Sequence, residues 1–174
     1  MGSAHVYSFA YMGTAARLYL EHAENAIESQ FYNSMSAILY SAFTIEGYLN
    51  HRGDKEFKHW SYIERKLSPR EKLVMIHDQI GVTVEFGREP LQSFTLAFRI
   101  RNCVAHAKTE ELDMPDVPPS RDSTVATPDA DWEALCTLET ARRIVDQSHA
   151  LVRTMHQQTG DRSDPFAVTK AGFR

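Results

Sequence analysis

The feature that most constrains this chain is the helical spacing of its apolar residues. In two long segments they recur every three or four residues, which places them on one face of a helix. An alternating, strand-like pattern occurs only over residues 82–86, which is too short to support a sheet alone. The sequence therefore predicts an all-α fold, an up-and-down bundle of four to five helices. The two apolar series are Phe9, Met12, Ala16, Leu20, Ala23 and Ile27, and then Met35, Ile38, Ala42, Ile45 and Leu49.

Glycine, proline and capping residues predict where the helices begin and end. Gly53 is the expected end of the second helix. A third helix should begin after Ser68, because Ser68 can cap it, Pro69 suits its first turn and Glu71 completes a capping box. Pro90 is expected to open a fourth helix, whose inner face carries the apolar residues Leu91, Phe94, Ala97 and Phe98.

The length of the chain, 174 residues, is that of one domain. Its C-terminal third is predicted to contain a loop, a helix and a tail. Residues 110–129 contain four prolines and should form an exposed loop. Apolar residues at helical spacing from Trp132 to Met155 predict one long fifth helix. We therefore expect a single helical domain over 1–157 and a flexible C-terminal tail over 158–174.

Composition restricts the class of protein and its compartment. Among 174 residues, 43% are hydrophobic and 24% are charged, as in ordinary globular domains. The only two cysteines, Cys103 and Cys136, exclude a disulfide scaffold and favour a reducing compartment. No apolar run approaches the length of a transmembrane helix, and the N-terminus does not resemble a signal peptide. We therefore expect a cytoplasmic protein that does not bind membranes.

The net charge of −4 is unevenly distributed along the chain. Residues 51–108 hold eleven basic and seven acidic residues, whereas the segments on both sides are acidic. The middle of the chain is therefore either a mixed-charge solvated surface or a local binding region for an anionic ligand.

Polar residues interrupt the apolar face of the fourth helix and of the second. Continuing from Phe98 by three or four residues leads to Arg101 and Asn102, and His106 lies one turn further on. Glu46 likewise shares a face with apolar positions of the second helix. These residues have two interpretations: a Glu46–Arg101 pair that fixes helix register, or a functional site.

The segment from Phe98 to His106, with Asn102 directly after Arg101, resembles the R-x4-H signature of the HEPN superfamily of all-α proteins. Residues 42–50, where Glu46 lies among apolar residues, and residues 67–72 also resemble stretches of that family, so the resemblance covers about residues 4–157. It implies a metal-independent endoribonuclease with no cofactor and a homodimer in which two motifs meet. It also implies, for members that act as toxins or anti-phage effectors, an antitoxin protein as partner.

The chemistry of RNA cleavage fits these residue types. The 2′-hydroxyl of RNA is the nucleophile, and His106 can act as a base or an acid near neutral pH. Arg101 offers a fork of donors to phosphate oxygens, and Asn102 lies four residues before His106, where it can orient the imidazole ring. Glu46 is expected to support Arg101 or His106. The alternative is an inactive helical module of the same fold that binds a nucleotide, RNA or a protein.

Other candidates have simpler interpretations. His149 and His156 share a helix face but form no recognised metal motif. We therefore expect them to be core or surface histidines, and we expect no metal site. Cys103 and Cys136 are each expected to be small buried apolar residues. The tyrosines and phenylalanine near the N-terminus are expected in the core or a dimer interface: Tyr7, Tyr11, Tyr19, Phe31 and Tyr32.

Overall fold

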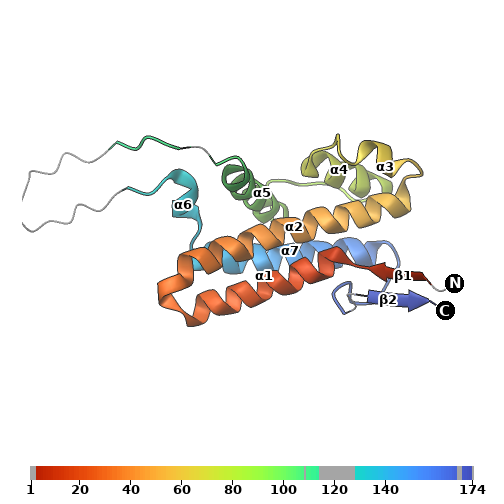
Figure 1. Cartoon of the computed structure of the whole chain (residues 1–174). Helices are drawn as coiled ribbons and strands as arrows, with labels where there is room; N and C mark the ends of the chain where they lie inside the picture. The colour runs from red at the N-terminus through yellow and green to blue at the C-terminus, as the bar shows by residue number, and fades with distance from the viewer. Residues whose placement is uncertain (1–2, 108, 114–127, 168–169, 174) are drawn as a thin grey trace, which may run out of the picture.

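The protein is an all-α bundle, as predicted (Figure 1). The computed structural model describes residues 3–107, 109–113, 128–167 and 170–173. Three short helical segments and one pair of strands accompany the long helices: η1 (Ile27–Ser29), α3 (Trp60–Ile63), α6 (Asp131–Leu135), β1 (Ser3–Val6) and β2 (Lys170–Phe173). The long helices are α1 (Ser8–Asn25), α2 (Gln30–Glu56), α4 (Pro69–Gln79), α5 (Leu91–Ala105) and α7 (Leu138–Gln158).

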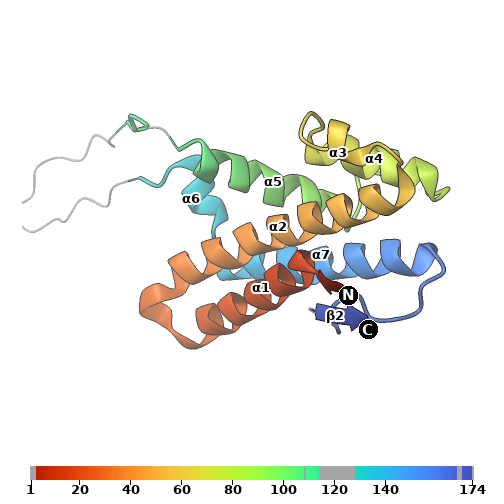
Figure 2. The same ribbon diagram turned by 45° about the vertical axis from the view of Figure 1, so that its right-hand side comes forward.

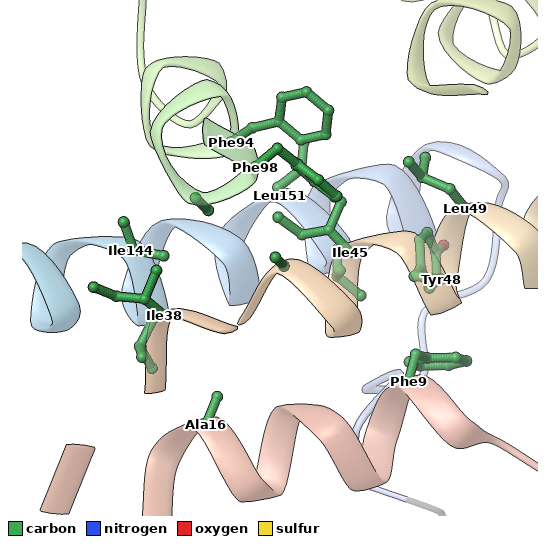
Figure 3. Close-up of a cluster of buried hydrophobic side chains, with 14 of the residues drawn as sticks. Phe9, Ala16, Ile38, Ile45, Tyr48, Leu49, Phe94, Phe98, Ile144 and Leu151 are labelled. Atoms are coloured by element: carbon green, nitrogen blue, oxygen red, sulfur yellow. The ribbon is translucent and has the colours of Figure 1, made fainter. Parts of the chain in front are cut away.

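Helix α2 is the centre of the bundle. It packs against α1, α7, α4 and α5, and α7 also contacts α1 and α5 (Figure 2). The core between these helices consists of the apolar residues at helical spacing (Figure 3). Burial of each large aliphatic side chain contributes about 1.5–3 kcal/mol. Large buried members of the core on α2, α5 and α7 include Ile38, Ile45, Tyr48, Leu49, Phe94, Phe98, Ile144 and Leu151.

The predicted end of the second helix at Gly53 is wrong, because α2 continues to Glu56. Gly53 is buried, and a Cβ there would overlap the indole ring of Trp60. The glycine is therefore needed for the close approach of α3 to α2 and does not end the helix.

The predicted start of α4 is confirmed. The Ser68 hydroxyl accepts a hydrogen bond from the Glu71 backbone N–H, and the Glu71 carboxylate accepts one from the Ser68 backbone N–H at 2.7 Å. Pro69 is the first helical residue, and Gly81 follows the helix with a φ of 72°, a conformation that favours glycine. Pro90 is the residue before α5, also as predicted.

The single fifth helix predicted from Trp132 to Met155 is instead two helices, α6 and α7. The break lies at Cys136 and Thr137, where the Thr137 hydroxyl accepts a hydrogen bond from the Thr140 N–H and caps α7. Cys136 is buried, as predicted. Of the predicted loop over 110–129, residues 114–127 lie outside the described residues.

Part of the segment 158–174, expected to be a flexible tail, packs against the rest of the chain. Strand β2 pairs antiparallel with β1, so the two ends of the chain form a small ribbon. Before it, Pro165 is buried, and the Phe166 ring stacks on His149 with centroids 4.3 Å apart. Residues 82–86, the one strand-like stretch of the sequence, belong to no strand. The packed domain therefore extends beyond residue 157.

Candidate functional site

The end of α5 carries the predicted site residues. Arg101 and Asn102 lie in the last turns of the helix, and His106 is its C-cap residue. The His106 backbone N–H donates to the Asn102 carbonyl at 3.0 Å, so these two residues are one helical turn apart. Both side chains are exposed, whereas Arg101 is only 20% exposed.

Arg101 is held by Glu46 from α2. Its Nη2 donates to Glu46 Oε2 at 3.0 Å, which confirms the pairing of these two residues inferred from the apolar faces. The guanidinium carbon of Arg101 also lies 5.0 Å from the centroid of the Phe98 ring, and Arg101 Nε is buried without a hydrogen-bond partner. Among the described residues, no contact joins Arg101 or Glu46 to His106. Glu46 therefore positions Arg101, and the imidazole lies apart from this pair.

Lys72 of α4 completes this cluster, and sequence analysis missed it. Its side chain is 5% exposed, and Nζ donates to Asn50 Oδ1 at 2.8 Å and lies 3.6 Å from Glu46 Oε1. Lys72 precedes Ile76 by four residues, so its place on the buried face of α4 was the available signal. Because one carboxylate is shared by two cations, the cluster keeps a net positive charge beside the exposed end of α5.

Cys103, expected to be buried, is exposed on α5. It lines an open pocket between α5 and α6 together with Trp132 and Leu135, so a position on the inner stretch of α5 does not imply burial here. Of the aromatic residues expected in the core or an interface, Tyr7, Tyr19 and Phe31 pack against the core. Tyr11 and Tyr32 are 39% and 67% exposed.

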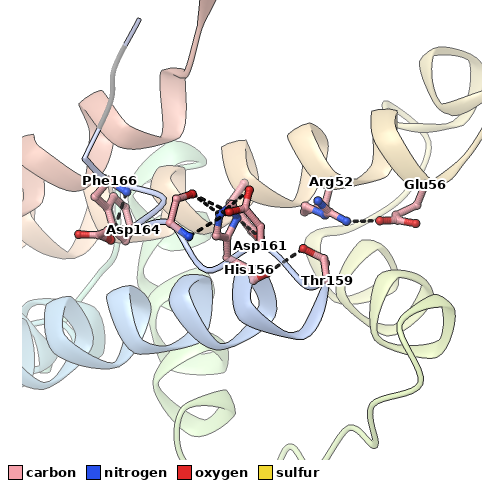
Figure 4. Close-up of polar contacts among 9 residues, drawn as sticks. Arg52, Glu56, His156, Thr159, Asp161, Asp164 and Phe166 are labelled. Atoms are coloured by element: carbon pink, nitrogen blue, oxygen red, sulfur yellow. Dashed lines mark hydrogen bonds and ion pairs between the residues drawn. The ribbon is translucent and has the colours of Figure 1, made fainter. Parts of the chain in front are cut away.

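A second polar cluster lies where the segment after α7 folds back onto α2 (Figure 4). The His156 Nε2 is 3.2 Å from Asp161 Oδ2, and its Nδ1 is 3.3 Å from the Tyr48 hydroxyl. Burial lowers the pKa of His156 and raises that of Tyr48. Beside them, burial and the charge of Lys55 lower the pKa of His51 to about 4.

This second cluster was not predicted from the sequence, because the pairing of His156 with Asp161 depends on the turn after α7. A cavity of about 210 Å³ lies next to it, lined in part by His51 and Lys55. No group of His, Cys, Asp or Glu side chains among the described residues could hold a metal ion. Of the two positions expected for His149 and His156, surface or core, the structure shows the buried one for both.

The comparisons with known proteins found no match for this chain: no family model, no curated protein and no solved structure is similar to it. Within the part of the chain that the structure describes, no helix is both long and apolar enough to cross a membrane.

Proposed function

We propose that this protein is a metal-independent endoribonuclease that cleaves RNA through attack of the 2′-hydroxyl. The observation that carries the proposal is the end of α5, where an exposed amide, Asn102, and an exposed imidazole, His106, follow Arg101, whose guanidinium is anchored by Glu46. An exposed histidine can exchange protons with substrate, and an anchored arginine is pre-organised for phosphate.

The proposed reaction is a transesterification at phosphorus. His106 takes the proton of the 2′-hydroxyl, the 2′-oxygen bonds to phosphorus, and the bond from phosphorus to the 5′-oxygen breaks. A proton is then delivered to the 5′-oxygen, which leaves a 2′,3′-cyclic phosphate and a 5′-hydroxyl. Arg101 stabilises the negative charge that develops on the phosphate oxygens.

The single imidazole of each motif cannot be base and acid in the same step, so the proposal includes a homodimer whose second copy supplies the other histidine. Within the chain, the basic middle segment contributes both Lys72 and Arg101. These two cations share one carboxylate, that of Glu46. In contrast, Arg142 and Arg153 each pair with a separate carboxylate, Glu24 at 2.8 Å and Asp164 at 3.1 Å, which compensates their charge. We therefore place phosphate binding on residues 51–108. RNA as substrate is consistent with a cytoplasmic protein and with a toxin or anti-phage effector held by an antitoxin.

RNA cleavage in excess chelator tests the proposal. Wild type should yield cyclic-phosphate ends, and Arg101→Ala and His106→Ala should each lose activity by roughly 10²–10⁴-fold. The matched controls, Arg143→Ala and His22→Ala, replace exposed residues of the same types outside residues 51–108 and should cleave like wild type. Equal activity in all five proteins, or activity that the chelator removes, would refute the proposal.

A second function rests on a specific observation: Arg101 contacts Glu46 and not His106. If this pair serves only to fix α2 against α5, the protein is an inactive helical module that binds RNA, a nucleotide or a protein. Expression of the wild type and of His106→Ala in cells distinguishes the two. Toxicity that His106→Ala relieves favours the enzyme, and equal growth favours the binding module.

A further inference from the structure

A groove of about 290 Å³ runs along α5 beside the start of α4. It ends at Asn102, which lies one helical turn before His106 and next to Arg101 in the chain. The groove is therefore continuous with the candidate cleavage site. The residues that line it include Ser68, Arg70, Phe94, Phe98, Arg99 and Asn102.

The floor of the groove is aromatic. The rings of Phe94 and Phe98 lie 4.7 Å apart between centroids, and Phe86 lies 6.2 Å from Phe94. Both floor rings are fixed by the core, where Phe98 is 7% exposed and Phe94 is 3% exposed (Figure 3). Ring edges held in this way offer a rigid apolar surface to a flat ligand at little cost in side-chain entropy.

The rim of the groove is positively charged. The guanidinium carbon of Arg70 lies 3.7 Å from the centroid of the Phe86 ring, which holds this cation at the edge. Arg99 lines the groove from α5 and is exposed. The nearby carboxylate of Glu71 is engaged by the Ser68 N–H and hydroxyl in the capping box. An apolar floor between two arginines matches a planar ring attached to phosphates.

We infer that this groove binds one unpaired nucleobase of single-stranded RNA adjacent to the phosphate that is cleaved, an inference that rests on the proposed function. Its volume lies near the lower limit of small-molecule pockets, roughly 300–1,000 Å³, and fits a single nucleotide unit. A base in the groove would place its phosphate at Asn102 and Arg101. The occupant must be single-stranded, because a base within a duplex is stacked and paired.

Filling the groove tests the inference. Thr95 lines the groove from the exposed face of α5, and its hydroxyl bonds only to the Leu91 carbonyl of its own helix among the described residues, so Thr95→Trp should fold normally. Thr154→Trp, at an exposed threonine of α7, is the matched control. Arg70→Ala removes the rim cation without adding bulk.

Binding is measured with a fluorescent ten-nucleotide RNA, single-stranded or annealed to its complement, on a His106→Ala background. We expect preference for the single strand, and a loss of roughly 5- to 100-fold for Thr95→Trp. Arg70→Ala should lose affinity most at low salt, and Thr154→Trp should bind like its parent. Circular dichroism melting checks that each variant is folded.

The outcomes separate this inference from the proposed function. If RNA is cleaved with dependence on Arg101 and His106 but Thr95→Trp leaves KM and affinity unchanged, the groove inference is wrong and the function stands. If wild type cleaves no RNA but Thr95→Trp still weakens single-strand binding, the groove's binding of an unpaired base stands, but its place beside a cleaved phosphate and the nuclease proposal both fail. Equal loss in Thr154→Trp, preference for the duplex, or no binding of single strands overturns the groove inference.

Discussion

His149 should make the protein sensitive to acid, because the fold requires its neutral form. Arg17 Nε can only donate, and it donates to His149 Nδ1 at 2.9 Å, so Nδ1 must be unprotonated. The proton therefore lies on Nε2, which donates to the Gly13 carbonyl at 3.2 Å. Phe166 stacks on the same ring, so protonation of His149 would disturb both the α1–α7 contact and the segment after α7.

The magnitude follows from the pKa shift. Burial, followed by the positive charges of Arg17 and Arg153, lowers the pKa of His149 from 6.5 to about 4, although the Asp164 carboxylate acts in the opposite direction. At 2% exposure the side chain is little screened by water. Because the folded pKa is the lower one, the unfolded state binds the extra proton, and stability is complete above pH 6.5 and declines toward pH 4. The total contribution is about 3 kcal/mol, of which about 2 kcal/mol is lost between pH 7 and 4.5.

The assay is urea unfolding between pH 7.5 and 4.5, comparing wild type with His149→Gln. Glutamine retains one acceptor and one donor for Arg17 and Gly13 but does not titrate in this range. The variant should therefore lose about 2 kcal/mol less than wild type on acidification. His59→Gln, at an exposed histidine, should follow wild type. Parallel pH curves for wild type and His149→Gln would refute the reasoning.

Two further substitutions test the packing of α2. Gly53→Ala should lower the free energy of unfolding by about 1–3 kcal/mol despite the better helix propensity of alanine, because its methyl group would overlap Trp60. In Gly47→Ala, in the same helix, the new methyl group would lie 3.3 Å from its nearest atom, so this variant should lose less stability than Gly53→Ala. Thermal melts of both variants measure the loss, and a larger loss for Gly47→Ala would contradict the explanation. Glu46→Gln should cost about 1–2 kcal/mol in urea unfolding, because it leaves the buried ammonium of Lys72 without its carboxylate. An unchanged midpoint would show that the cluster does not stabilise the fold.

The sequence predicted the site where the signal was local. The R-x4-H spacing selected Arg101 and His106, and the apolar face of α2 singled out Glu46 as a support for one of them. The structure shows that Glu46 pairs with Arg101. Lys72 was missed although its place on the buried face of α4 was a local signal, and its contact with Glu46 depends on the packing of α4 on α2. The catalytic roles of these residues stay predictions, as do the homodimer and the RNA substrate.

Local interactions explain which parts of the fold were predictable. Helical periodicity and the capping box at Ser68 act over three or four residues, so the sequence alone determined the helical class and the start of α4. The role of Gly53 and the docking of Phe166 on His149 depend on segments distant in the chain. Only the tertiary structure could decide them, because the free energy of such contacts comes from neighbours that the local pattern does not contain.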